Sequence, residues 1–211
     1  MIDYLRDPQA IYRQSFATIR AEVPLASLPA DFAPVALRLI HACGMTDIVG
    51  DLAFSPGAAA AGRAALAGGA AVLCDARMVA EGIIAGRVPA GNRVVTLTEA
   101  EGTAARAERE ATTRSAAAIA GARGLLGGAI VAIGNAPTAL FRLLEELDAG
   151  APRPALILGF PVGFVGAAEA KAELARDPRG CAYITLYGRR GGSALAAAAV
   201  NALAGNVEDA P

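Results

Sequence analysis

Short apolar runs alternate with helical stretches along most of the chain after Gly44. The clearest runs, bounded mostly by Gly, Pro or Asp, are residues 70–74, 93–97, 129–133, 155–158 and 183–186. Helix candidates fall around them at 57–67, 76–84, 104–122, 137–148, 167–176 and 192–204. Near-continuous apolar strands that alternate with helices indicate a parallel sheet covered on both faces. The pattern predicts a three-layer α/β/α, flavodoxin-like fold with a mainly parallel sheet of five strands and a possible sixth around residues 48–54.

Two further helices are expected before the first strand. Asp7 followed by Pro8 is typical of a helix start. Apolar residues then recur at helical spacing at Ile11, Tyr12, Phe16, Ile19 and Val23. A second helix is predicted from about Asp31 to Cys43, with Gly44 as its C-terminal stop.

The composition fits one well-cored domain spanning residues 1–211 and carries no membrane signature. Hydrophobic residues make up 55% of the chain, but the excess is alanine spread through helical segments. The longest weakly polar stretch, residues 194–204, is too short to span a bilayer, which needs about 20 apolar residues. The N-terminus carries Asp3, Arg6 and Asp7 instead of a basic flank and an apolar run, so we expect no signal peptide.

Charge and cysteine content narrow the choice of partners and compartment. A net charge of −1, no Trp and only 5% aromatic residues argue against nucleic-acid binding. Cys43, Cys74 and Cys181 are scattered without a C-x-x-C pair, which fits a reducing compartment, so we expect a cytoplasmic protein. Every basic residue except Lys171 is an arginine. Arginine suits carboxylate binding, although GC-rich coding DNA produces the same bias.

His41 is the single histidine and the first candidate for proton chemistry near neutral pH. A histidine side chain has an unperturbed pKa of about 6.5 and can both donate and accept a proton under cellular conditions. The absence of a second histidine excludes multi-histidine zinc sites, and we expect no metal. From its position alone, a lone histidine near a helix end is more often a helix cap or a surface residue than a catalytic residue.

Three glycine-containing loops follow predicted strands, at residues 134–140, 159–166 and 188–193. Each would present free backbone N–H groups above the sheet and could receive an anion. Glycine at strand-to-helix turns also has a purely structural explanation. None of the loops is a Walker A motif or a dinucleotide fingerprint. Asn135, Arg190 and Ser193 are the candidate ligand-binding residues in these loops.

Two more polar residues fall inside predicted helices. Arg114 is flanked by hydroxyl residues that suit carboxylate binding, although an arginine there is more often a solvated side chain or an ion-pair partner. Ser15 lies in the middle of the first helix, where serine is often merely tolerated. No Gly-x-Ser-x-Gly elbow surrounds any serine, so hydrolysis ranks low.

Six segments together resemble the precorrin-8X methylmutase family of cobalamin biosynthesis, which includes the cobalt-precorrin-8 methylmutases. They are His41–Gly44, Asp75–Val79, Thr113–Ala117, Ala132–Leu140, Pro161–Glu169 and Gly188–Ala194. The resemblance runs nearly end to end, in the order of the family. Two positions depart from it: Gln14 stands where the family usually has Arg, and Ala170 where it usually has Ser.

The resemblance implies an isomerase that moves a methyl group from carbon 11 to carbon 12 on ring C of a contracted tetrapyrrole. It converts precorrin-8X to hydrogenobyrinate, or cobalt-precorrin-8 to cobyrinate, without a metal or organic cofactor. His41 matches the acid/base residue, which would protonate the ring C nitrogen, and a helix C-terminus would favour its imidazolium form. Ser15 and Arg114 match positions in or near the substrate site. The family is homodimeric, with sites near the subunit boundary.

Two other functions stay open at this point. One is a tetrapyrrole carrier that binds the polycarboxylate pigment without converting it. The other is an unrelated nucleotide-binding α/β protein that uses the loop at 134–137. The shared motifs serve both the cobalt-free and the cobalt-containing branch, so they do not choose between the two substrates.

Overall fold

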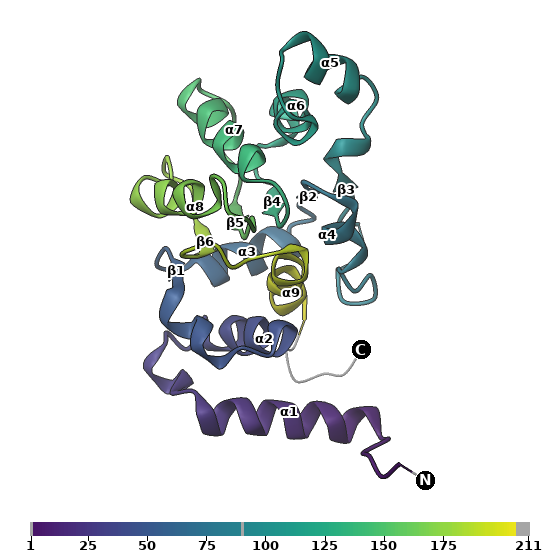
Figure 1. The fold of residues 1–211 in the computed structure, drawn as a ribbon, viewed down its shortest axis with the longest axis vertical. Helices are drawn as coiled ribbons and strands as arrows, with labels where there is room; N and C mark the ends of the chain where they lie inside the picture. The colour runs from purple at the N-terminus through teal and green to yellow at the C-terminus, as the bar shows by residue number, and fades with distance from the viewer. Residues whose placement is uncertain (1, 90, 206–211) are drawn as a thin grey trace.

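The computed structural model describes residues 2–89 and 91–205, and its centre is a six-stranded sheet (Figure 1). The strands are β1 (Leu52–Phe54), β2 (Val72–Cys74), β3 (Val94–Thr96), β4 (Ile130–Ile133), β5 (Leu156–Gly159) and β6 (Tyr183–Leu186). Their order is β1-β6-β5-β4-β2-β3, and only the pairing of β1 with β6 is antiparallel. The five parallel strands, counted from β2, follow the flavodoxin order 2-1-3-4-5. The predicted fold class is therefore confirmed, with the possible sixth strand as an antiparallel edge.

Alternate residues of the central strands face two separate cores. Val72 and Ile130 belong to one apolar cluster, whereas Leu73 and Val131 belong to the other. All four side chains are buried. Burial on both faces is the reason why these strands appear in the sequence as continuous apolar runs.

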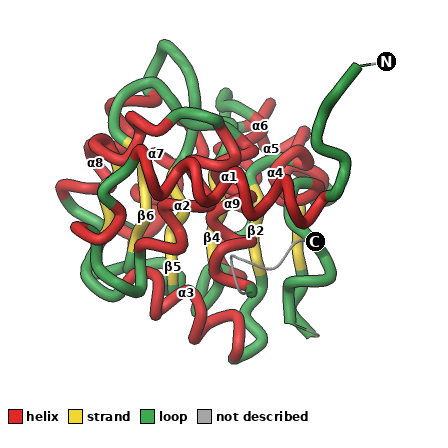
Figure 2. Tube along the Cα trace, turned by 90° about the horizontal axis from the view of Figure 1, so that it is seen from below, coloured by secondary structure: helices red, strands yellow, loops and turns green. Residues whose placement is uncertain are grey.

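Helices cover both faces of the sheet, and two of them extend the fold on one side. They are α1 (Pro8–Glu22), α2 (Ala33–Cys43), α3 (Ala58–Ala67), α4 (Arg77–Glu81), α5 (Thr103–Arg109), α6 (Arg114–Gly121), α7 (Pro137–Asp148), α8 (Ala167–Arg176) and α9 (Ser193–Ala204). Helices α5 to α8 lie over one face, and α3, α4 and α9 over the other (Figure 1). Helix α2 packs on α9, and α1 packs on α2 as the outermost element. Seen from below, α1 runs across the front of the molecule with the strands behind it (Figure 2).

One stretch that was predicted as a single helix is interrupted in the structure. The stretch 104–122 forms two helices, α5 and α6, separated by residues 110–113. Ala111 adopts a positive φ of 48°, which a helix does not accommodate. Thr113 then caps α6, because its hydroxyl accepts a hydrogen bond from the Ala116 N–H at 3.2 Å. As a result Arg114 is the first residue of a helix and does not lie in the middle of one.

Candidate functional site

His41 lies in the last turn of α2, as the sequence predicted. The helix ends at Gly44, which has a left-handed φ of 68° and donates its N–H to the Ile40 carbonyl at 2.8 Å. Glycine meets this conformation at little cost because it has no Cβ. The apolar face of α2 is buried against α9, which leaves His41 half-buried toward α1. The local sequence thus fixes both the end of the helix and the place of the imidazole.

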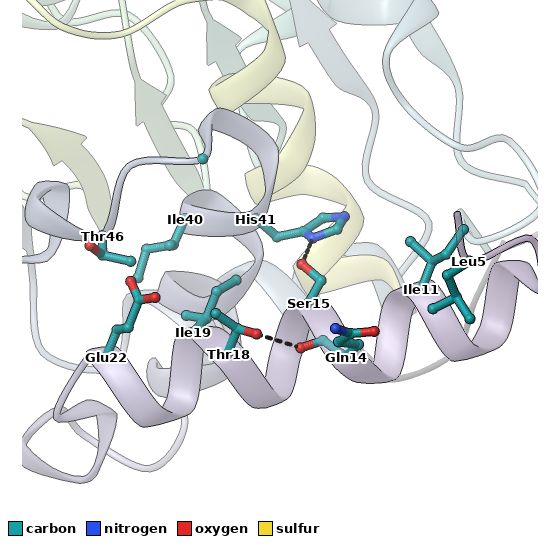
Figure 3. A pocket seen from close by; sticks show the side chains of 11 residues that line it. Leu5, Ile11, Gln14, Ser15, Thr18, Ile19, Glu22, Ile40, His41 and Thr46 are labelled. Carbon is teal, nitrogen blue, oxygen red and sulfur yellow. Dashed lines mark hydrogen bonds between the residues drawn. The ribbon is translucent and has the colours of Figure 1, made fainter. Parts of the chain in front are cut away.

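Ser15 and His41 meet across the contact between α1 and α2. The Ser15 hydroxyl lies 2.8 Å from Nδ1 of His41 (Figure 3). In the neutral imidazole the hydroxyl donates to Nδ1, whereas in the imidazolium Nδ1–H donates to the hydroxyl oxygen. In both states the second ring nitrogen, Nε2, points away from Ser15. Two candidates that are 26 positions apart therefore form one unit, and Ser15 orients the imidazole.

This pair borders a cavity of about 450 Å³. The cavity is lined by Leu5, Ile11, Gln14, Ser15, Thr18, Ile19, Glu22, Ile40, His41, Gly44 and Thr46 (Figure 3). Its volume lies within the range of small-molecule sites, and its lining mixes apolar walls with a few polar groups. Gln14 is one of those polar groups, so the departure from the family pattern falls directly on the cavity wall.

Aromatic rings surround the imidazole on its protein side. The ring centroids of Tyr12 and Phe16 each lie 5.1 Å from that of His41. Burial lowers the pKa of His41 below its usual value, and the positive charge of Arg38 lowers it further. Both effects act against the imidazolium form, which the helix C-terminus was expected to favour.

Arg114 and Asn135 lie apart from this cavity. Arg114 begins α6, which packs with α7 on the opposite face of the sheet from α2. Its side chain is exposed, and its guanidinium donates to the Thr98 carbonyl at 3.4 Å. Asn135 belongs to the loop that leads from β4 into α7. Within this chain, neither residue joins Ser15 and His41 at the cavity.

The loop after β4 is not free to bind an external anion. The backbone N–H groups of Gly134, Asn135 and Ala136 donate to the Asp75 carboxylate at 2.9, 3.0 and 2.8 Å. Asp75 is only 1% exposed, and burial raises the pKa of its carboxyl group despite these three bonds. An internal carboxylate thus fills the anion site predicted here, which removes the basis of the nucleotide-binding hypothesis. Sequence reasoning missed this role, although an acid directly after an apolar strand was a usable signal.

The other two glycine loops are tied to each other and to neighbouring segments of the chain. The guanidinium of Arg190 donates to Asp47 at 2.7 Å and to Asp51 at 2.6 Å. Its backbone carbonyl accepts a hydrogen bond from the buried ammonium of Lys171. In the loop at 159–166, Gly163 donates its N–H to the Arg189 carbonyl at 3.2 Å. Of the three loops expected to receive an anion, the loop after β4 is occupied by an internal carboxylate, and for the other two the expectation stays a prediction.

Ser193 and Arg190 occupy different places in the last loop. Ser193 is the first residue of α9, directly after Gly192. Asp47 and Asp51, the partners of Arg190, belong to the 3₁₀ helix Thr46–Asp51, which follows α2. Arg190 therefore ties this loop to the segment that borders the His41 cavity at Thr46. In this structure its guanidinium acts as an internal tie.

Within the described ranges, 2–89 and 91–205, no group of three or more His, Cys, Asp or Glu side chains is arranged to bind a metal ion. Cys43, Cys74 and Cys181 are all free thiols. Burial raises the pKa of the Cys74 thiol to about 12, which leaves it protonated at neutral pH. His41 is therefore the described side chain at this cavity that is suited to proton transfer near neutral pH.

The chain matches known proteins over nearly its whole length. The family model of precorrin-8X methylmutase covers residues 10–206. The chain belongs to the precorrin-8X methylmutase family. The resemblance inferred from the six motifs is confirmed, and the chain is an isomerase of cobalamin biosynthesis.

Relatives of this methylmutase include proteins named precorrin-8X methylmutase and proteins named cobalt-precorrin-8 methylmutase. A precorrin-8X methylmutase of Pseudomonas aeruginosa is 69% identical, and the match covers 97% of this chain and 98% of that protein. A cobalt-precorrin-8 methylmutase of Priestia megaterium is 36% identical, over 93% of this chain and 87% of that protein. The crystal structure of precorrin-8X methylmutase from Thermus thermophilus superposes with a TM-score of 0.83 at 43% identity, covering 92% and 94% of the two chains. No helix in the described part of this methylmutase is long and apolar enough to cross a membrane.

Proposed function

We propose that this methylmutase moves the methyl group of its substrate from carbon 11 to carbon 12 on ring C, with His41 as the general acid. The observation that carries the proposal is the Ser15–His41 pair at the border of the 450 Å³ cavity. The pair fixes the imidazole, and its Nε2 is left without a partner among the described residues. A positioned imidazole of this kind contributes typically about 10²–10⁴-fold as a general acid.

The proton path follows from the geometry of the pair. When His41 is protonated, Nδ1–H donates to Ser15 and Nε2–H is left to donate to the ring C nitrogen. Protonation of that nitrogen withdraws electrons from the conjugated ring. The bond from the methyl group to carbon 11 then breaks as the bond to carbon 12 forms. A proton leaves the macrocycle afterwards and returns to the imidazole, so the isomerisation neither consumes nor releases a proton.

The experiment that tests this function follows one labelled atom. Purified protein is mixed with precorrin-8X that carries ¹³C in the methyl group on carbon 11. We expect the absorption spectrum to change and the ¹³C resonance to move to that of a methyl group on carbon 12. Bound pigment with an unchanged spectrum would instead support a carrier. Parallel reactions with cobalt-precorrin-8 decide which branch the protein serves.

We further infer a homodimer in which the Arg114 surface of one copy reaches the substrate at the His41 cavity of the other. The support is the separation of Arg114 and His41 by the sheet within one chain. Because the substrate has many carboxylates, an exposed arginine from a second copy would complete the site.

Mixing two inactive variants tests this arrangement. His41→Ala and Arg114→Ala are each expected to lose activity as pure dimers. Random re-pairing gives about half mixed dimers with one intact site each, so about a quarter of wild-type activity returns if the residues act across the interface. Activity that stays at the level of the separate variants contradicts the shared site. His41→Ala mixed with a second His41 variant is the matched control and should restore nothing.

A further inference from the structure

Arg38 is a buried cation one turn before His41 on α2. It is only 4% exposed, and its guanidinium carbon lies 5.5 Å from the centre of the Tyr12 ring. Its Nη1 atom has no hydrogen-bond partner within the described part of the chain. A buried guanidinium with an unmade hydrogen bond costs folding free energy. An arginine at this position therefore calls for a reason other than stability.

Tyr12 connects this cation to the imidazole. Its ring contacts both Arg38 and His41, with a centroid separation of 5.1 Å from the imidazole. Burial lowers the pKa of Arg38, and the like charge of Arg87 lowers it further, yet it remains far above neutrality for an arginine. The cation is thus permanent on the protein side of the imidazole.

The titratable groups around His41 come from few elements. Helix α1 contributes Tyr12 and, across the cavity, Glu22, while α2 contributes Arg38. Thr46, from the segment after α2, is neutral, and every residue of α9, the helix beneath α2, is described and none is titratable. Within the part of the chain that the structure describes, Arg38 is the charged side chain that lowers the pKa of His41.

We propose that Arg38 is a positioning residue for the proton transfer, which keeps His41 neutral until the polycarboxylate substrate enters the cavity. The inference rests on the proposed role of His41 as the general acid. The substrate carboxylates offset the charge of Arg38, and His41 then takes a proton from water. The resulting imidazolium passes its proton from Nε2 to the ring nitrogen and recovers one when the macrocycle loses it. When the product leaves, His41 returns this proton to water and is neutral again. A neutral resting imidazole also avoids repulsion with Arg38 in the empty site.

The single histidine makes the test direct, because its ring resonances need no assignment. The pKa of His41 is measured by NMR titration of the ligand-free protein and of Arg38→Met. We expect the midpoint of the variant to move to higher pH. Arg13→Met is the matched control, since it removes one positive charge from α1 at an exposed side chain that pairs with Asp7. Its midpoint should stay at that of the wild type.

A midpoint in folded Arg38→Met that is unchanged, or lower, overturns the proposal. If Arg38→Met does not fold, Arg38→Gln is measured in its place. A measurement on the wild type alone serves as well: the midpoint in the folded protein should lie below that in urea, and an equal or higher folded midpoint also overturns the proposal.

Turnover separates this inference from the proposed function. In Arg38→Met the alkaline limb of the single-turnover pH profile, where the general acid His41 loses its proton, should move to higher pH like the NMR midpoint. If the midpoint moves and the profile does not, Arg38 controls an imidazole that is not the acid, and the positioning role fails. The titration needs no catalysis, so a failure of the proposed function leaves its outcome readable.

Discussion

At the scale of residues, the site consists of side chains that act on each other across long sequence distances. Ser15 orients His41 from another helix, and Arg38 and Tyr12 surround the ring on its protein side. Lys171 shows the same principle on the far face of the sheet, where its fully buried ammonium donates to the carbonyl of Arg190. Burial lowers the pKa of Lys171 to about 8.

The lysine gives the stability of the protein a pH dependence at alkaline pH. An unfolded lysine has a pKa of about 10.4, so the folded state binds fewer protons than the unfolded state between about pH 8 and that value. Stability therefore rises with pH in this window and the contribution is lost as the pH falls through about 8. We expect the unfolding free energy of the wild type to increase relative to that of Lys171→Met as the pH rises through this window. Urea titrations at several pH values measure this difference, and a constant difference would contradict it.

Residue-level contacts explain which site residues the sequence could identify. His41 could be identified as the single histidine of the chain. Both His41 and Ser15 could also be identified because they match positions of the family pattern. The occupant of the loop after β4 was not, because Asp75 lies 59 positions before Gly134 and only the folded sheet brings them together. A glycine turn indicates available N–H groups, but whether an internal carboxylate takes them is a property of tertiary structure.

At the scale of elements, the contact between α1 and α2 forms the cavity. Both helices were predictable, since α1 begins at Pro8 after its Asp7 cap and α2 ends at Gly44. The break between α5 and α6 was not, because the local pattern of alanine and arginine favours helix throughout. The interruption depends on the backbone at Ala111 and on the cap at Thr113, whose hydroxyl also bonds to that of Thr138 at 2.8 Å.

The end of α2 can be tested by one substitution. Gly44→Ala places a Cβ at a φ of 68° with nothing within 4 Å, so its cost is backbone strain alone, about 1 kcal/mol. Gly50→Ala is the matched control, since it too has open space and lacks a positive φ. Chemical denaturation should show the loss in Gly44→Ala only. Equal stability of the two variants would mean that this turn does not depend on glycine.

At the scale of the whole molecule, the sheet separates two functional surfaces. The His41 cavity lies beyond α9 on one side, and Arg114 lies with α6 on the other. The covered, mainly parallel sheet was predictable from the alternation of strands and helices, because β2, β4, β5 and β6 are buried on both faces. The packing of α1 outside α2 is the addition that makes the cavity, and periodicity alone does not specify it.

The most direct measurement is the single-turnover rate of His41→Gln with precorrin-8X, with protein in excess over substrate. Glutamine keeps a polar group beside Ser15 but cannot transfer a proton near neutral pH. The account predicts that the variant still binds the pigment and converts it about 10²–10⁴-fold more slowly than wild type. Ser27→Ala, at an exposed residue outside the lining of the cavity, should convert it at nearly the wild-type rate. A His41→Gln rate equal to that of wild type would contradict the account.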